Sequence, residues 1–250
     1  MAKQAGWNIE AVLDDDIVGG DKSPGQDPGV VRVFSEGLPA AADEKQLQLI
    51  RSVGAENDSS SRELARYILE VGGAYTPGVQ PTLVFRTDRY LRGGDHSAFN
   101  QQGFAAVRFT EYRENFAHQH QNLRTENGHV YGDLPEFVDF AYVANVARIN
   151  AAALGSLALA PAAPSNTRLE ASELTNDSTL SWDLSSDPAV TGYRVVWRSL
   201  GSPAWQSSQD VGRVGQLRLP VSKDNVVFGV QALGKSGQAS LASYPLPLRK

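Results

Sequence analysis

The sequence predicts two domains of different class, an α/β domain followed by an all-β sandwich. In residues 1–160, short apolar segments alternate with stretches whose apolar residues recur every three or four positions, as strands and helices alternate in layered α/β proteins. From residue 166 onward only short segments of alternating polarity remain, separated by turn-forming residues. Residues 161–165 between them are rich in Pro and Ala, and we interpret them as a linker.

The first domain contains two predicted helices among its strands. Residues 61–71 have apolar side chains at helical spacing, with serines just ahead that favour capping. A long helix is expected to open at Asp133, with Glu136 completing a capping box, and to run to about residue 158. The short apolar segments are predicted strands: residues 7–18, 30–34, 81–85 and 105–109.

The second domain, residues 166–250, has no long helical stretch and no histidine, so we expect it to be non-catalytic. Its predicted strands lie within six segments: residues 167–171, 178–184, 192–199, 215–221, 225–233 and 240–246.

Composition excludes several classes of protein. Hydrophobic residues make up 41% and charged residues 20% of the 250 residues, which is typical of a globular protein. No apolar run is long enough for a membrane span, and the N-terminus lacks the apolar region of a signal peptide. Residues 1–164 hold 14 Lys/Arg against 21 Asp/Glu, so no nucleic-acid partner is expected. Because there is no cysteine, a metal would need His, Asp or Glu ligands.

The candidate residues for chemistry follow predicted strands or lie in glycine-rich turns. All four histidines fall within a 34-residue stretch of the first domain, where clustering beside carboxylates points to a metal site; structural or surface-exposed histidines are the alternative. Residues 14–16 are three aspartates at the end of the strand 7–18, where α/β sheets bind ligands; a solvated acidic loop is the alternative.

Two further segments carry histidines. Asp95 and His96 follow a Gly-Gly pair that allows close backbone approach to a ligand, although Asp95 alone also suits a helix N-cap. His118 and His120 lie in the polar loop after the strand 105–109. Side chains two residues apart share one face of an extended backbone, so on such a backbone this pair suits a common ion.

Together these segments resemble the zinc exopeptidases of metallopeptidase family 28, which include aminopeptidases and glutaminyl cyclases. The Asp-x-x-Gly motif of that family matches residues 16–19 (DIVG), and its Asp-His-x-x-Phe motif matches residues 95–99 (DHSAF). Its last ligand, a histidine with an acidic residue four positions later, matches His118, but Asn122 stands at the later position. The resemblance covers about residues 5–160 and implies an incomplete three-layer αβα domain.

The resemblance also implies roles for these residues. Asp16 and His118 would be zinc ligands, one on each of two neighbouring ions. Asp95 would orient groups near the substrate, and His96 and His120 would lie behind the ligands or at the rim. Asn115 and Phe116 would form part of the pocket wall, together with residues 86–92. The reaction implied is hydrolysis of N-terminal residues from peptides.

Other parts of the family pattern have no counterpart in these 250 residues. The His-x-Asp motif, the bridging aspartate and the Glu-Glu pair with the general base should precede the strand 7–18, and no catalytic residue is therefore assigned. Two ligands do not complete a catalytic zinc site, which normally has three. We expect the chain to be the C-terminal half of such an enzyme and to be inactive alone.

The second domain resembles a fibronectin type III domain over about 85 residues. The matching residues lie at strand positions of that fold, although Val226 stands where such domains usually carry a corner tyrosine: Trp182, Tyr193, Val195, Leu217, Leu219, Phe228, Val230 and Ala232. We expect this domain to contact a protein or a cell-surface polymer.

Three functions stay open: a zinc aminopeptidase with a peptide substrate, a glutaminyl cyclase with one zinc, and a non-catalytic binding protein with a degenerate peptidase-like domain. The family resemblance implies a secreted or periplasmic full-length protein.

Overall fold

The structure, a computed structural model, describes residues 1–248, and the chain divides into two compact units. The first comprises Met1–Arg51 and Ala55–Ala152; the second comprises Ser52–Gly54 and the chain from Ala153 onward. Each unit is described by itself. The boundaries expected from the sequence, with a linker at 161–165, stay a prediction.

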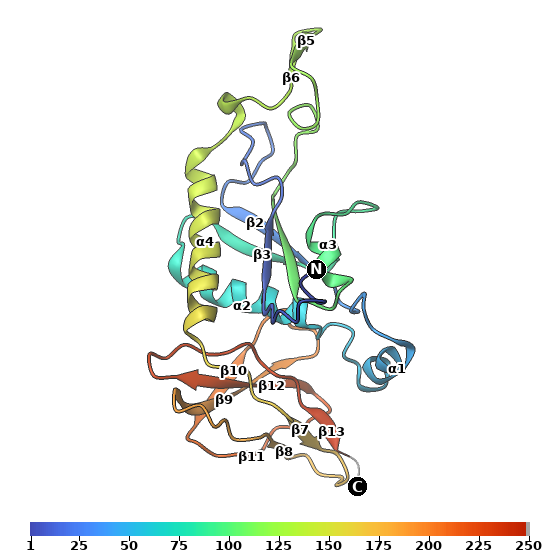
Figure 1. Ribbon diagram of the computed structural model, residues 1–250, viewed down its shortest axis with the longest axis vertical. Helices are drawn as coiled ribbons and strands as arrows, with labels where there is room; N and C mark the ends of the chain where they lie inside the picture. The colour runs from blue at the N-terminus through green and yellow to red at the C-terminus, as the bar shows by residue number, and fades with distance from the viewer. Residues whose placement is uncertain (249–250) are drawn as a thin grey trace. The chain divides into compact units, whose positions relative to one another are not determined.

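A four-stranded mixed sheet forms the centre of the first unit (Figure 1). Its strands are β1 (Val12–Asp15), β2 (Val30–Ser35), β3 (Gln80–Val84) and β4 (Ala106–Glu111), in the order β1-β4-β2-β3. β1 runs parallel to β4, and β4 runs antiparallel to β2. The carboxyl ends of β1 and β4 therefore meet the amino end of β2 at one edge of the sheet.

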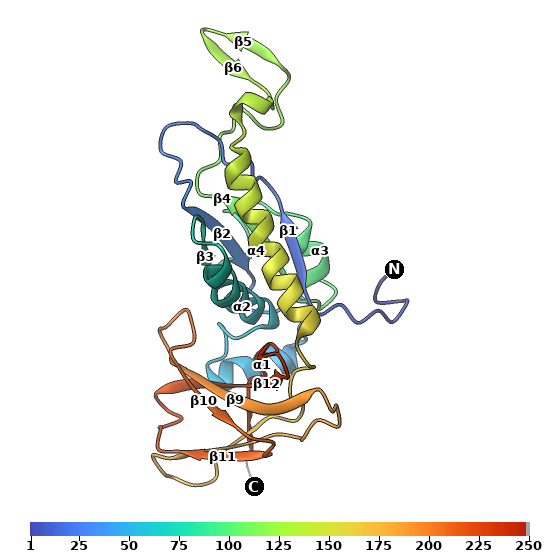
Figure 2. The same cartoon turned by 90° about the vertical axis from the view of Figure 1, so that its left-hand side faces the viewer.

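Helices cover both faces of this sheet. α2 (Ser60–Tyr75) and α4 (Phe140–Leu159) lie on one side, and the short α3 (His96–Asn100) lies on the other (Figures 1 and 2). The remaining elements lie outside these layers: α1 (Glu44–Val53), the hairpin β5 (Arg124–Glu126) and β6 (His129–Tyr131), and the 3₁₀ helix η1 (Pro135–Phe137). No helix in residues 1–248 combines the length and hydropathy that crossing a bilayer requires.

The two faces of the sheet differ in chemistry because successive strand residues point to opposite sides. The face toward α2 and α4 carries Val33, Val107 and Phe109, all fully buried, and each such side chain contributes about 1.5–3 kcal/mol by leaving water. The opposite face carries Arg108 and, paired with it across the β1–β4 ladder, Asp14. Charged side chains thus occupy a face that residues 86–100 cover.

Most predicted elements of the first unit are confirmed. The strands expected at 30–34, 81–85 and 105–109 appear as β2, β3 and β4 within one or two residues. The helix expected at 61–71 is α2, and the Oγ atom of Ser59 accepts a hydrogen bond from the Arg62 amide at 3.1 Å, as an N-cap does.

Two boundaries were wrong. The strand predicted at 7–18 is only β1, Val12–Asp15, because residues 7–11 have no partner strand and Trp7 is 66% exposed. The helix predicted to open at Asp133 begins at Phe140. Val138 is extended and interrupts any helix from Asp133, and the carboxylate of Asp139 accepts hydrogen bonds from the Ala141 and Tyr142 amides, so Asp139 caps α4.

The second unit is a sandwich of two sheets, which confirms its all-β class. One sheet has the order β10-β9-β12 and the other β11-β8-β7-β13. Both sheets contribute to one core, in which Leu180 and Leu219 pack with Tyr193, Phe228 and Val230. The strands are β7 (Arg168–Glu170), β8 (Ser178–Ser181), β9 (Val190–Ser199), β10 (Ser207–Val211), β11 (Gln216–Leu219), β12 (Val226–Gly234) and β13 (Leu246–Leu248).

The whole is therefore a mixed α/β chain. The segment expected at 240–246 contains only the first residue of β13, and β10 is a sandwich strand that the sequence did not indicate. Its five residues, SSQDV, include one apolar side chain, so periodicity gives no signal there.

Candidate functional site

A pocket of about 380 Å³ lies where β1 and β4 end. Asp16 and Asp21 reach it from the segment after β1, His118 from the segment after β4, and Phe137 from η1 just before α4. The parallel pairing of β1 with β4 brings these segments together, because both strands end at the same edge of the sheet.

His118 is held in place by contacts on several sides. Its Nδ1 atom is in close contact with a carboxylate oxygen of Asp21 and lies 3.1 Å from Nδ2 of Asn115. The closer contact assigns the Nδ1 proton as a donor to Asp21. The ring also stacks on Phe137, with centroids 3.5 Å apart and planes 4° apart. The carboxylate therefore fixes both the tautomer and the orientation of the imidazole.

Two carboxylates behind His118 have opposite pKa shifts. Burial would raise the pKa of Asp21, but hydrogen bonds with Ser23 and His118 outweigh burial and lower this pKa below its ordinary value. Burial raises the pKa of Glu111, and the hydrogen bonds from the Asp21 and Gly20 amides only partly offset it. Asp21 is thus the charged partner of His118, while Glu111 binds the backbone that carries Asp21.

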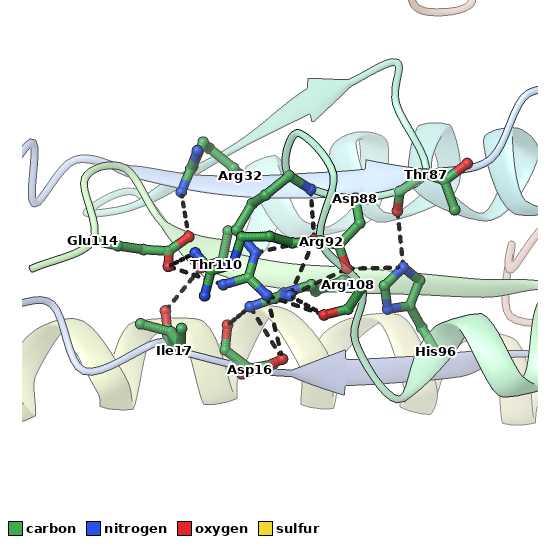
Figure 3. Close-up of polar contacts among 12 residues, drawn as sticks. Asp16, Ile17, Arg32, Thr87, Asp88, Arg92, His96, Arg108, Thr110 and Glu114 are labelled. Atoms are coloured by element: carbon green, nitrogen blue, oxygen red, sulfur yellow. Dashed lines mark hydrogen bonds and ion pairs between the residues drawn. The ribbon is translucent and has the colours of Figure 1, made fainter. Parts of the chain in front are cut away.

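Asp16, the other predicted ligand, is tied to the charged face of the sheet. Its Oδ2 atom lies 3.1 Å from Nη2 of Arg108 and 4.0 Å from Nη2 of Arg89 (Figure 3). The Arg108 side chain is fully buried and also lies 3.1 Å from the carboxylate of Asp88. The Asp16 side chain is 38% exposed, so its carboxylate reaches the pocket while a buried guanidinium orients it.

A second carboxylate, that of Glu114, forms ion pairs with three other arginines of the charged face (Figure 3). Its oxygens lie 2.9 Å from Arg89, 3.1 Å from Arg92 and 3.5 Å from Arg32. Burial would raise the pKa of Glu114, but the hydrogen bond and the charge of Arg89, with the charge of Arg92, lower it overall. Glu114 is therefore a buried carboxylate that its arginines keep charged.

His96 lies away from the pocket and joins three segments of the chain. It is fully buried, with Nε2 2.8 Å from the Thr87 carbonyl oxygen and Nδ1 3.3 Å from Asp14 Oδ2. Asp95, just before α3, is exposed and makes no side-chain capping bond. His96 thus links β1, the segment after β3 and α3.

Of the seven residues predicted for the site, the pocket brings four together: Asp16, Asn115, His118 and His120. His120 is exposed and has a positive φ of 55°. Phe116 is 62% exposed and lies on a neighbouring pocket that also includes Asn115. Asp95 and His96 do not line the 380 Å³ pocket.

The sequence interpretation missed Asp21, Glu111 and Arg108. A signal existed for the first two, since each is an acidic residue that follows or closes a strand leading to the site. Arg108 had none, because a single arginine inside an apolar strand reads as a solvent-facing position.

The donor atoms of this chain fit part of a zinc site. His118 with a carboxylate on Nδ1 has the arrangement typical of a metal-binding histidine, and Asp16 provides an oxygen donor in the same pocket. In residues 1–248, however, no group of three or more His, Cys, Asp or Glu side chains is arranged to hold a metal ion. These residues therefore do not form a complete catalytic zinc site.

Comparison with known proteins finds fungal proteins of similar sequence. No family model matches the sequence. The chain is 48% identical over 250 residues to a protein of Pyrenophora tritici-repentis and 47% identical over 250 residues to one of Pyrenophora teres f. teres, both named probable zinc metalloprotease. A Leptosphaeria maculans protein with the same description is 46% identical over 248 residues. Each match covers 98% of this chain but only 52%, 52% and 57% of the relative.

Two solved structures match about a third of the chain. The chicken CNTN1 FN1–FN3 domains match 34% of it at 18% identity and a TM-score of 0.30, covering 30% of that chain. The FN5 domain of Drosophila Lar matches 36% at 20% identity and a TM-score of 0.26, covering 99% of that chain. The sandwich assignment rests on the strand order and the shared core. The chain thus spans about half the length of the curated relatives it matches, and nearly all of it is similar to fungal proteins named probable zinc metalloprotease.

Proposed function

We propose that this chain supplies Asp16 and His118 as ligands to the zinc site of a metalloprotease that removes N-terminal residues from peptides. One observation carries the proposal: both side chains line one pocket at the edge of the sheet, and a charged carboxylate orients His118. The fungal relatives' name supports the same chemistry. The remaining ligands and the general base would come from sequence outside these 250 residues.

Each residue of the chain then has a defined task. Asp21 holds the proton on Nδ1 of His118, which directs the other ring nitrogen to the metal. Arg108 orients the carboxylate of Asp16 through a contact of 3.1 Å, and Phe137 fixes the plane of the imidazole by stacking. Zinc, when bound, polarises a substrate carbonyl and activates water.

A non-catalytic binding protein is the second candidate. The observation that favours it is the lack of a three-residue metal-binding group in residues 1–248. On either proposal we expect the sandwich unit to contact a protein or polymer partner, and we propose a secreted location.

The test is a chimera in which this chain replaces the matching 250 residues of the Pyrenophora tritici-repentis relative. We expect the chimera to release the chromogen from an aminoacyl p-nitroanilide, to lose activity with a chelator and to regain it with zinc. Asp16→Asn and His118→Ala should abolish this activity, and Asp21→Asn should lower zinc affinity by about 10- to 100-fold, as loss of a supporting carboxylate does. Arg51→Gln, on α1, is the control.

The controls separate the candidates. The unaltered relative is assayed in parallel, and a peptide with N-terminal Gln tests cyclisation on the same site. The 250-residue chain alone should hydrolyse nothing. If the relative is active but the folded chimera binds zinc equally well with and without Asp16 and His118, the proposal is wrong.

A further inference from the structure

A second and larger pocket, of about 940 Å³, adjoins the candidate site. Asn115 lines both pockets, and Gln119 of the first pocket donates a hydrogen bond to Glu114 of the second. The two pockets are therefore neighbours along residues 114–119.

Positive charge dominates the lining of this pocket. It includes four arginines and one carboxylate: Arg32, Arg89, Arg92, Arg113 and Glu114. Residues 1–164 as a whole carry an excess of acidic residues, with 14 Lys/Arg against 21 Asp/Glu. The positive charge at this pocket is therefore opposite in sign to the net charge of residues 1–164. The local field there favours an anion.

Internal pairing cancels only part of this charge. The carboxylate of Glu114 is shared by Arg89, Arg92 and Arg32, and its side chain is only 4% exposed; Arg89 also lies 3.0 Å from the carboxylate of Asp88. Arg113 donates instead to the carbonyl oxygen of Pro24 at 3.0 Å. The guanidiniums of Arg92 and Arg113 thus keep donor capacity at the exposed side of the pocket, because each guanidinium has five N–H donors.

Aromatic side chains complete the lining. Phe116 is 62% and Tyr112 49% exposed, and the guanidinium of Arg92 lies 5.4 Å from the Phe116 ring centroid. Arginines with exposed rings suit a ligand that presents both a carboxylate and apolar atoms, as a peptide does.

We propose that this pocket binds a carboxylate group of a peptide ligand, with Arg92 and Arg113 as the contacting residues. The inference rests on the proposed function in one respect: the ligand is the part of a peptide that continues from the Asp16–His118 pocket. The carboxylate comes from the C-terminus of a short peptide or from an acidic side chain of a longer one. Glu114 holds the arginines in place and competes with the ligand for their charge.

The test measures binding without hydrolysis. The 250-residue chain in EDTA is titrated, by chemical-shift changes in NMR spectra, with three N-acetylated peptides: tetra-alanine with a free C-terminus, tetra-alanine amide, and Ala-Glu-Ala-Ala amide. We expect binding of at least one carboxylate peptide and weaker or no binding of tetra-alanine amide. The free acid and the Glu peptide then distinguish the two sources of carboxylate. Because the N-terminus is blocked and metal is removed, the result does not depend on peptidase activity.

Variants assign the binding to this pocket. Arg92→Gln should weaken binding about tenfold, as expected for loss of a charge-assisted hydrogen bond, and Arg113→Gln about threefold, because the Pro24 carbonyl oxygen already takes one of the Arg113 donors. Glu114→Gln should tighten binding, because it removes the carboxylate that Arg32 and Arg92 share with Arg89, whereas Arg89 stays paired with Asp88. Arg51→Gln, an exposed arginine outside the pocket, should leave binding unchanged.

The proposal is overturned if tetra-alanine amide binds as well as the carboxylate peptides, or if neither carboxylate peptide binds. It is also overturned if Arg92→Gln and Arg113→Gln, shown to be folded by their spectra, bind as the unaltered chain does. Both variants are at surface-accessible positions, so the test stands even if Glu114→Gln does not fold.

Discussion

The guanidinium of Arg108 lies wholly inside the first unit, 3.1 Å from the carboxylates of both Asp16 and Asp88. Burial would raise the pKa of Asp88, yet hydrogen bonds from Arg89 and the charge of Arg108 lower it, so Asp88 is charged as well as buried. Loss of Arg108 therefore leaves the buried carboxylate of Asp88 with one guanidinium fewer to balance its charge, although Arg89 still lies 3.0 Å from it.

We therefore predict that Arg108→Met lowers the free energy of unfolding of the first unit by about 3–5 kcal/mol, the cost of leaving buried charge uncompensated. Urea denaturation followed by circular dichroism at 222 nm measures this, because the helices report on the first unit. Arg51→Gln, an exposed arginine, should change the stability by less than about 0.5 kcal/mol. A loss below about 1 kcal/mol for Arg108→Met would show that water, rather than Arg108, balances the two carboxylates.

At the same scale, sequence reasoning located some residues of the site and missed others for a physical reason. Asp16 and His118 follow strands and match motif positions, so their presence at one pocket was predictable from local order along the chain. The side chains that contact them, Arg108 for Asp16 and Asp21 for His118, were not predictable from local order. Asp21 meets His118 across 97 residues and Arg108 meets Asp16 across 92, and such pairings depend on the strand order β1-β4-β2-β3.

At the scale of elements, the start of α4 shows how two similar signals compete. Asp133 with Glu136 has the spacing of a capping box, but Pro135 opens a 3₁₀ helix and Val138 is extended, so the α-helix starts later. Asp139 instead accepts hydrogen bonds at 2.9 and 3.1 Å from the first amides of α4. The apolar periodicity indicated the helix, and the prolines that follow it indicated an end near residue 158, close to the observed Leu159; its beginning depended on tertiary context.

Asp139→Ala should accordingly cost about 1 kcal/mol of the first unit's stability, the usual price of losing an N-cap. Asp133→Ala, at an exposed position outside the helix, should cost less than about 0.5 kcal/mol. Thermal and urea unfolding of the two variants side by side checks this. A larger loss for Asp133→Ala than for Asp139→Ala would contradict the assigned cap.

At the scale of the whole molecule, the second unit has a hydrophobic core of its own. The core cluster comprises strand residues from both sheets together with Trp182, which is 5% exposed and packs beside Tyr193 with ring centroids 5.5 Å apart. The predicted all-β class followed from the spacing of short alternating segments, which is a local property. The incomplete αβα class of the first unit stays a prediction, since sheet order alone does not assign it.

From this core we predict that residues 153–250, expressed alone, fold into a stable sandwich. The segment should show dispersed NMR signals and a single cooperative thermal transition. Trp182→Ala should remove about 3–5 kcal/mol from its stability, as truncation of a buried aromatic side chain does. A broad, non-cooperative transition of the unaltered segment would show that the sandwich needs the rest of the chain.

The contact of Arg108 with two carboxylates also limits which substitutions positions 16, 88 and 108 can accept during evolution. Loss of Arg108 leaves Asp16 and the buried Asp88 without the guanidinium that they share, and loss of either carboxylate removes one of the two anions that hold Arg108, so single substitutions at these sites should be selected against. Among homologous sequences we expect the three positions either to be retained together or to change together. In homologues that lack the arginine at position 108 and the aspartate at position 88, we expect position 16 to vary as well.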